Sequence, residues 1–350
     1  MIKTALIGYG YSARTFHLPL IANEAALQLV AISSSQSAAA IAYPHLKHYQ
    51  DAPSLIMHSD ARLVVITSPN QSHFALAKLA LQMGKDVLLE KPFVLSLAQG
   101  IELQQLAVRQ QCQLAVYHNR RFDGDFLTLQ QLIKQQTLGD IRFFASHFDR
   151  FRPEPRIRWR EQAGPGSGIL WDLGPHLIDQ ALVLFGAPQA ITAQCRILRP
   201  GGESTDFFQL QLHYADKEVL LQSSPFCANL TPRFMLQGSL GSYQKSGLDP
   251  QEDALRAGQT PGGAAWGQDD PALFGELATA QQRRRLPTLA GDYPQFYRQF
   301  VRALQGQADL PVPLQDALLG IQLIELAERS AVLGQRLVVE QVDCSVKLKV

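Results

Sequence analysis

Three side chains in two short motifs have the chemistry needed to move a proton to or from an alcohol. Asp172 and His176 are four residues apart, so a helix would place them on one face. Lys91 follows the apolar run 87–89, where a strand of an open α/β sheet would present groups to its ligand crevice. A lysine, an imidazole and a carboxylate beside a nucleotide suit proton transfer during alcohol oxidation. These residues are therefore our candidate catalytic group.

Each of the three residues alone also has an ordinary structural explanation. Lysines are usually exposed, so Lys91 could simply hold its charge in water. His176 could be a core histidine with a satisfied ring. Asp172 could be a carboxylate favoured at a helix N-terminus, with Pro175 tolerated in the first turn. Only the conjunction with a nucleotide-binding fold favours catalysis.

The nucleotide site is predicted at the start of the chain. Residues 8–13, GYGYSA, match the pattern G-x-G-x-x-A directly after an apolar strand over 2–7. The first glycine permits a tight turn, the second lets the backbone approach a pyrophosphate, and a small third residue allows close helix–strand contact. We therefore expect dinucleotide contacts from Gly8, Gly10, Tyr11, Ser12 and Ala13.

Residues after the later strands should complete the cofactor site. The second strand is followed by Ser34 and Ser35, where an acidic residue normally accepts from the adenosine ribose. The missing carboxylate removes repulsion against a 2′-phosphate and favours NADP over NAD, although the serines could instead cap the next helix. His73 could line the cofactor or be a surface helix residue. The further candidate cofactor contacts are Thr67, Pro69, Asn70, His73, Glu90 and Lys91.

The first third of the chain alternates between strand and helix patterns. Helices are expected after residue 8 to about 21, from a Ser72 cap to about Gly84, and over 96–109. The expected strands span 2–7, 27–33, 63–67, 87–90 and 114–117. Such alternation predicts a parallel sheet with right-handed crossovers, hence an α/β Rossmann domain over residues 1–119.

After about residue 120 the pattern changes to period-two stretches. Helices are expected at about 172–185, 293–305 and 314–333, and a long loop over 247–290. The predicted strands lie at 141–149, 207–214, 219–223 and 234–237. We predict an α+β domain over residues 120–350 with a mainly antiparallel, open sheet.

Composition excludes several classes of function. Lysine plus arginine number 32 against 31 aspartate plus glutamate, so no charge field predicts a nucleic-acid or membrane partner. The run Arg283–Arg285 is best explained as a solvated surface turn. Four well-separated cysteines argue against a zinc site or a disulfide framework, and no metal site is predicted. The N-terminus begins with a strand pattern and no apolar stretch is long enough to span a bilayer, so we expect a cytoplasmic protein.

The motifs resemble those of the Gfo/Idh/MocA family, the relatives of glucose–fructose oxidoreductase and inositol dehydrogenase. The resemblance runs essentially end to end and includes Gly8-Tyr9-Gly10, Glu90-Lys91-Pro92, and Asp172 with His176 and Asp179. The strings at 117–123, 148–153, 159–161 and 247–252 are similar to an NADP-linked scyllo-inositol dehydrogenase branch. Two positions depart from the pattern: Ala13 replaces a third glycine, and Gln36 stands where some relatives have an arginine. The second departure weakens the NADP prediction.

The resemblance implies roles for particular residues. Lys91, Asp172 and His176 would form the catalytic group, with His176 accepting the hydroxyl proton and Asp172 supporting it. Lys91 would hydrogen-bond the reacting oxygen, or could itself be the base if its pKa is depressed. Asn119, Arg120 and Asp149 would contact a polyol, although Asp149 could equally pair with Arg150 across the sheet. A homo-oligomer, dimer or tetramer, through the second-domain sheet is also implied.

We therefore expect an oxidoreductase that transfers hydride between NADP(H), or NAD(H), and a secondary hydroxyl of a cyclic polyol or sugar. Scyllo-inositol is one candidate substrate. Because fold and cofactor do not determine the substrate, a redox-assisted glycosidase or another carbonyl reductase is an alternative. A second alternative is a regulator that senses a dinucleotide without turnover, but such a protein has little need of the Lys91, Asp172 and His176 group.

Overall fold

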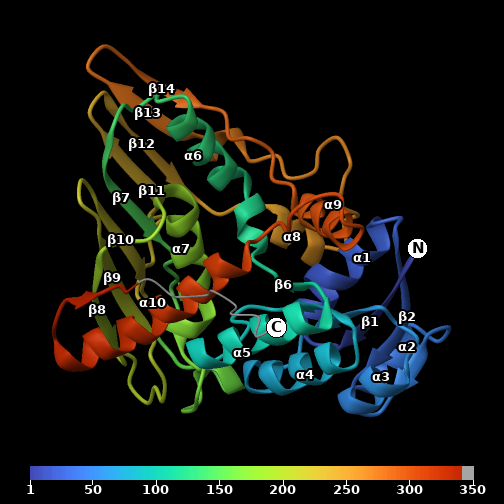
Figure 1. Cartoon of the computed structure of the whole chain (residues 1–350). Helices are drawn as coiled ribbons and strands as arrows, with labels where there is room; N and C mark the ends of the chain where they lie inside the picture. The colour runs from blue at the N-terminus through green and yellow to red at the C-terminus, as the bar shows by residue number, and fades with distance from the viewer. Residues whose placement is uncertain (341–350) are drawn as a thin grey trace.

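The computed structural model describes residues 1–340 and contains two sheets with their helices (Figure 1). The first sheet is fully parallel and has the strand order β3-β2-β1-β4-β5-β6. This is the order of the doubly wound dinucleotide-binding fold, so the predicted Rossmann domain is confirmed. Its strands are β1 (Ile2–Ile7), β2 (Leu27–Ser33), β3 (Lys47–Tyr49), β4 (Leu63–Ile66), β5 (Asp86–Leu89) and β6 (Leu114–Val116).

The helices of this domain follow the expected crossovers with some changes. Ser96 caps α5 by accepting from the amide of Gln99, as its position before a helix predicts. Ser72 does not cap α4, because the helix begins at Asn70 and the Ser72 hydroxyl donates to the carbonyl of Pro69. The helices are α1 (Leu18–Asn23, after a π-helical turn at Ala13–His17), α2 (Ser37–Ala42), α3 (Ala52–His58), α4 (Asn70–Gln82) and α5 (Leu97–Gln110).

Strand register aligns the residues that follow each strand. Ile7 pairs with Ser33 on one side and Ile66 on the other, and Ile66 pairs with Leu89. The next residues of these strands therefore meet along the carboxyl edge of the sheet. They are Gly8, Ser34, Thr67 and Glu90. This is the edge at which open α/β sheets bind their ligands.

The second sheet has the order β14-β13-β12-β11-β7-β10-β9-β8-β15 and is antiparallel except where β7 pairs with β10. In β9, Phe208, Leu210 and Leu212 are buried while the alternating glutamines are not. The mainly antiparallel sheet is thus confirmed. Its strands are β7 (Ile141–His147), β8 (Ala190–Arg196), β9 (Phe207–His213), β10 (Glu218–Ser223), β11 (Pro232–Gly238), β12 (Gly241–Ser246), β13 (Gly275–Thr279), β14 (Arg283–Leu286) and β15 (Leu337–Val338).

Helices of the second half lie on one side of this sheet (Figure 1). The helix that carries Asp172 and His176 begins at Ile169, earlier than predicted, so Pro175 lies inside it and not in its first turn. Pro175 cannot donate to the carbonyl of Trp171 one turn earlier. The helices are α6 (Gly124–Lys134), α7 (Ile169–Phe185), α8 (Gln251–Arg256), α9 (Tyr293–Leu304) and α10 (Leu314–Leu333).

The prediction of a long loop over 247–290 is wrong. This segment contains α8, a 3₁₀ turn at Pro271–Leu273, and the strands β13 and β14. Polar side chains hold it in place: Asp249 accepts from the amide of Gly124 at 2.7 Å, and Gln251 accepts from the amide of Tyr293 at 2.6 Å. The run Arg283–Arg285 is exposed as expected, but it lies on the edge strand β14 and not in a turn.

Helix α9 returns from the second half of the chain to pack on the first domain, beside α1 (Figure 1). Tyr293, Phe296 and Phe300 share a core cluster with Leu6 and Tyr117. The rings of Tyr117 and Phe296 meet edge to face with centroids 4.7 Å apart. The boundary near Asn119 stays a prediction. Within residues 1–340 we find no helix with the length and apolarity to cross a membrane.

Candidate active site

A cavity of about 490 Å³ opens beside the carboxyl edge of the first sheet. It is lined from the first domain by Tyr11, Ser12, Glu90, Lys91 and Asn119, and from the rest of the chain by Arg120, Asp172 and His176. The structure thus brings together residues from both predicted motifs and from the glycine-rich turn. Helical spacing places Asp172 and His176 on the same wall, as expected.

Lys91 joins the end of β5 to the first turn of α7. Its ammonium donates to the main-chain carbonyl of Asp172 at 2.8 Å and lies 3.6 Å from the carboxylate of the same residue. The side chain is only 12% exposed, which rules out the alternative that Lys91 simply holds its charge in water. Both charged groups therefore lie together at the cavity wall, where low solvent access strengthens their attraction.

Burial and neighbouring charges shift the pKa values of all three side chains. Burial lowers the pKa of Lys91, while the Asp172 carboxylate opposes this change. Burial disfavours ionisation of Asp172, but Lys91 and Arg160 outweigh it and lower its pKa to about 2. Burial, Lys91 and Arg120 together hold the pKa of His176 well below 6.5. At neutral pH His176 is therefore an uncharged imidazole that can accept a proton.

His176 also has an unused ring nitrogen. Within residues 1–340, its Nδ1 atom is buried without a hydrogen-bond partner. A buried polar atom without a partner costs stability, and such atoms are often found at functional sites.

Glu90 links the glycine-rich turn to α9. Its carboxylate accepts from the hydroxyl of Ser12 and the main-chain amide of Lys91, and lies 3.0 Å from Nε2 of His17. The other nitrogen of His17 contacts the hydroxyl of Tyr297 at 2.6 Å. Burial opposes ionisation of Glu90, but the bond and charge of His17 prevail and lower its pKa to about 2. Sequence analysis missed His17 and Tyr297, because no local motif connects positions so far apart.

The glycine-rich turn fits a dinucleotide. Gly8 has φ of +97°, and a Cβ there would lie 2.8 Å from Oγ1 of Thr67, so only glycine is accommodated without strain. A Cβ on Gly10 would meet nothing within 4 Å, which leaves room for a ligand to approach the backbone. Ala13 is fully buried, as close helix–strand packing requires.

The remaining candidate cofactor residues lie along the same edge, with one exception. Ser34 and Ser35 follow β2; Ser34 accepts from the amide of Gln36, and neither serine caps α2. Asn70 and Lys91 line a smaller hollow together, and Pro69 is an exposed residue at the start of α4.

His73 is the exception and needs correction. It is 1% exposed, and its two ring nitrogens contact the carbonyls of Pro92 at 2.9 Å and Ser68 at 2.8 Å. His73 is therefore neither a cofactor wall nor a surface residue, but a buried link between two strand ends.

Two of the three candidate polyol contacts reach the cavity. Asn119 lines it and makes no side-chain hydrogen bond to any described residue. Arg120 lines it while bonded to Glu252 at 2.6 Å. Asp149 does not reach it, because its carboxylate accepts from the amide of Ser224 at 2.8 Å. It is not ion-paired with Arg150 either, so both sequence-based expectations for Asp149 are corrected.

Sequence analysis also missed the role of Glu252, which accepts from the hydroxyl of Tyr11 at 2.7 Å as well as from Arg120. The segment 247–252, which contains Glu252, was noted only as part of the family resemblance. The cavity is also lined by the five arginines of 150–160. The strings of the resemblance contained Arg150, Arg152 and Arg160, but not Arg156 or Arg158. The density of these arginines along the chain was a visible signal of an unusually positive site.

Comparisons with known proteins agree with this architecture. Residues 2–118 match the Gfo/Idh/MocA family described as "Oxidoreductase family, NAD-binding Rossmann fold", and residues 130–339 match its C-terminal alpha/beta domain. The chain is 44% identical to the uncharacterized oxidoreductase YdgJ of Escherichia coli, over 94% of this chain and 96% of that protein.

Two further relatives are similar over nearly their whole length. The scyllo-inositol 2-dehydrogenase (NADP(+)) IolW of Bacillus subtilis is 35% identical over 94% of each chain. A crystal structure of a Klebsiella pneumoniae protein has a TM-score of 0.92 and 42% identity, covering 98% of this chain and 97% of that one.

The two glycines of the turn should respond differently to alanine. Gly8→Ala should lower the free energy of unfolding by about 1–3 kcal/mol, because a positive φ and the contact with Thr67 must both be relieved. Gly10→Ala should leave that free energy nearly unchanged but weaken dinucleotide binding. Chemical denaturation and titration calorimetry with NADP⁺ measure the two effects. Equal losses of stability in both variants would contradict this assignment.

Glu90 should make the protein sensitive to acid. Its pKa is about 2 in the fold against an ordinary 4.5, so its stabilisation is complete above pH 4.5 and is lost as the pH falls toward 2. Glu90→Gln should cost up to about 3 kcal/mol at pH 7 and flatten this acid dependence. The exposed Glu102, ion-paired with Lys78, provides a control: Glu102→Gln should cost less than about 1 kcal/mol. Denaturation curves between pH 7 and 3 test this prediction, and an unchanged slope in Glu90→Gln would overturn it.

Proposed function

Because the chain belongs to the Gfo/Idh/MocA family of NAD(P)-dependent oxidoreductases, we propose that it transfers hydride between NADP(H) and a secondary hydroxyl of a cyclic polyol or sugar. The observation that carries the proposal is the convergence of Lys91, Asp172 and His176 on one cavity with the glycine-rich turn. Groups that handle a proton and a turn that cradles a dinucleotide thus face the same space.

A nicotinamide cofactor bound at residues 8–13 supplies the acceptor of the hydride and its two electrons. The residues of the chain handle the remaining proton. His176, whose neutral imidazole lines the cavity, accepts the hydroxyl proton as the C–H bond breaks and the carbonyl forms. Lys91 donates a hydrogen bond to the substrate oxygen, which lowers the cost of negative charge on it.

Asp172 completes this arrangement. Its carboxylate is 3.6 Å from the Lys91 ammonium, so it holds that group charged and aimed at the cavity. Lys91 remains the alternative proton acceptor, since burial lowers its pKa as well. In the reverse direction the same groups return the proton to the carbonyl oxygen.

The NADP preference rests on the end of β2. Ser34 and Ser35 offer hydroxyls and no carboxylate, so a 2′-phosphate there meets no like charge. The similarity to a B. subtilis enzyme named as NADP-dependent points the same way. The name of that relative also makes scyllo-inositol the first substrate to test. The cytoplasmic location and the homo-oligomeric state stay predictions.

An absorbance screen for NADPH formation tests the proposal. Inositols, pentoses and hexoses are each incubated with the protein and NADP⁺, and then with NAD⁺. We expect turnover with at least one polyol or sugar, and loss of turnover in Lys91→Ala and His176→Ala with cofactor binding retained. Binding of cofactor with no turnover of any substrate would favour the sensing regulator, and a released sugar without net cofactor reduction would favour the glycosidase.

The pH dependence should identify the proton acceptor. With His176 as base, kcat/KM for oxidation should persist below pH 6.5, because the imidazole stays neutral there. Lys91→Met removes a positive charge that lowers the His176 pKa, so the acid limb of the residual rate should move to higher pH. Disappearance of the acid limb in Lys91→Met would instead make Lys91 the base.

An added carboxylate at Ser34 should reverse the cofactor preference. Ser34→Asp places a negative charge beside a 2′-phosphate and should raise the KM for NADP⁺ by about tenfold or more, while NAD⁺ is little affected. Asn23→Asp adds the same charge at the distal end of α1 and is the matched control. Equal effects on both cofactors would refute this role of Ser34.

A further inference from the structure

A second hollow, which we call the arginine pocket, adjoins the active-site cavity at Asp172 and at arginines of 150–160. Five of its lining residues are arginines: Arg150, Arg152, Arg158, Arg160 and Arg199. Its acidic lining residues are Glu161, Asp172 and Asp206. Asp172 and four of the arginines, Arg150, Arg152, Arg158 and Arg160, line both the arginine pocket and the active-site cavity. A molecule in the active site can therefore extend into this pocket.

Three of the arginines are paired with neighbouring carboxylates, one of which, Asp172, is shared with Lys91. Arg199 is paired with Glu161 at 2.9 Å and Asp206 at 3.0 Å. Arg158 is paired with Glu161 at 2.6 Å, and Arg160 lies 3.8 Å from Asp172. These pairs account for the acidic residues of the pocket.

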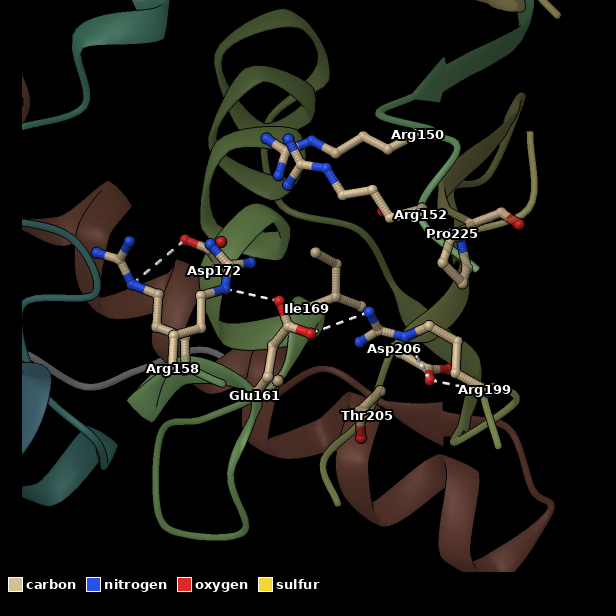
Figure 2. Close-up of a pocket in the computed structure, with 14 residues that line it drawn as sticks. Arg150, Arg152, Arg158, Glu161, Ile169, Asp172, Arg199, Thr205, Asp206 and Pro225 are labelled. Atoms are coloured by element: carbon tan, nitrogen blue, oxygen red, sulfur yellow. Dashed lines mark hydrogen bonds and ion pairs between the residues drawn. The ribbon is translucent and has the colours of Figure 1, made fainter. Parts of the chain in front are cut away.

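Arg150 and Arg152 have no such partner. Within residues 1–340, neither guanidinium forms an ion pair or a hydrogen bond with a carboxylate. Figure 2 shows their side chains extending in parallel, with the guanidinium ends next to each other and directed toward Asp172. Arg150 also packs over the ring of Phe148 at 5.1 Å, which limits its movement.

Holding two like charges together is costly unless an anion balances them. Partial burial, with Arg150, Arg156 and Arg158 nearby, lowers the pKa of Arg152 to about 10. Burial likewise lowers the pKa of Arg150. Guanidinium groups in pairs match the oxygens of carboxylates and phosphates, which relieve this repulsion. The amino end of α7 at Ile169, which also lines the pocket, adds the positive end of a helix dipole.

The lining of the arginine pocket favours an anion on the substrate over one on the cofactor. No residue before Arg150 lines it, whereas the expected pyrophosphate position at residues 8–12 and the ribose position at Ser34 belong to the first domain. Arg150 and Arg152 line both this pocket and the active-site cavity, where His176 lies, so an anion between them can belong to a molecule that reacts there.

We propose that the substrate carries an oxyanion group, seated between Arg150 and Arg152, on the molecule whose hydroxyl reacts at His176. This inference rests on the proposed dehydrogenase function and refines its substrate class. The arginines of the pocket exceed its acidic residues by two, so the charge balance favours a dianion, a phosphate monoester of a polyol or sugar, over a carboxylate.

Matched neutral and charged substrates test the proposal. The protein with NADP⁺ is assayed on glucose, gluconate and glucose 6-phosphate, and on myo-inositol and its monophosphate. We expect kcat/KM for a phosphorylated compound to exceed that of its neutral partner by about tenfold or more. Arg150→Gln and Arg152→Gln should each reduce this ratio by about tenfold, and Arg152→Lys by less. The control Arg283→Gln, on the exposed strand β14, should leave the ratio unchanged.

Outcomes for the two proposals are distinguishable. Equal or better turnover of neutral compounds, with ratios unaffected in Arg152→Gln, overturns the oxyanion site and leaves the dehydrogenase function standing. Preference for gluconate supports the oxyanion site and overturns the dianion assignment.

If no compound is turned over, the proposal of dehydrogenase activity on these substrates fails. Binding of inorganic phosphate then tests the arginine pocket independently of turnover. A thermal upshift with phosphate that is lost in Arg150→Gln but kept in Arg283→Gln supports the pocket. An equal upshift in both variants overturns it.

Discussion

The contact between the Lys91 ammonium and Asp172 is the interaction on which the active site depends. It joins the end of β5 in the first sheet to the first turn of α7 in the second half of the chain. Because both groups are largely buried, neither is stable there without the other. The pairing keeps Asp172 ionised and, through the charge of Lys91, helps keep His176 neutral. This contact therefore positions Lys91 against Asp172 and contributes to the charge states of the catalytic group.

Two further features turn this contact into a site. Parallel strand register aligns Gly8, Thr67 and Glu90 on one edge, so the glycine-rich turn faces Lys91 without any long-range motif. Glu90 then fastens that turn to His17, and through it to Tyr297 of α9. Since α9 comes from near the C-terminal end of the chain, the cofactor side of the cavity is held by residues from both halves.

Residues defined by local patterns were predictable, and residues defined by distant contacts were not. The strand β1, the turn after it and the i, i+4 pair of Asp172 and His176 all follow from short-range spacing. The ordered segment 247–290 was missed because side chains of Asp249 and Gln251, and not hydrophobic periodicity, hold it. His73 and Asp149 were misplaced for a related reason: a polar side chain near a site is often used to satisfy backbone groups.

The central claim is that His176 accepts the proton of a substrate hydroxyl while hydride leaves the carbon that bears this hydroxyl. The most direct measurement follows deuterium from scyllo-inositol and glucose 6-phosphate, each deuterated on its ring carbons, into NADP⁺ by NMR in single turnover. We predict label on the reduced nicotinamide with at least one substrate, and transfer slower by about 100-fold or more in His176→Ala at unchanged cofactor affinity. Transfer at the wild-type rate in His176→Ala, or bound cofactor without label from either substrate, would contradict the account.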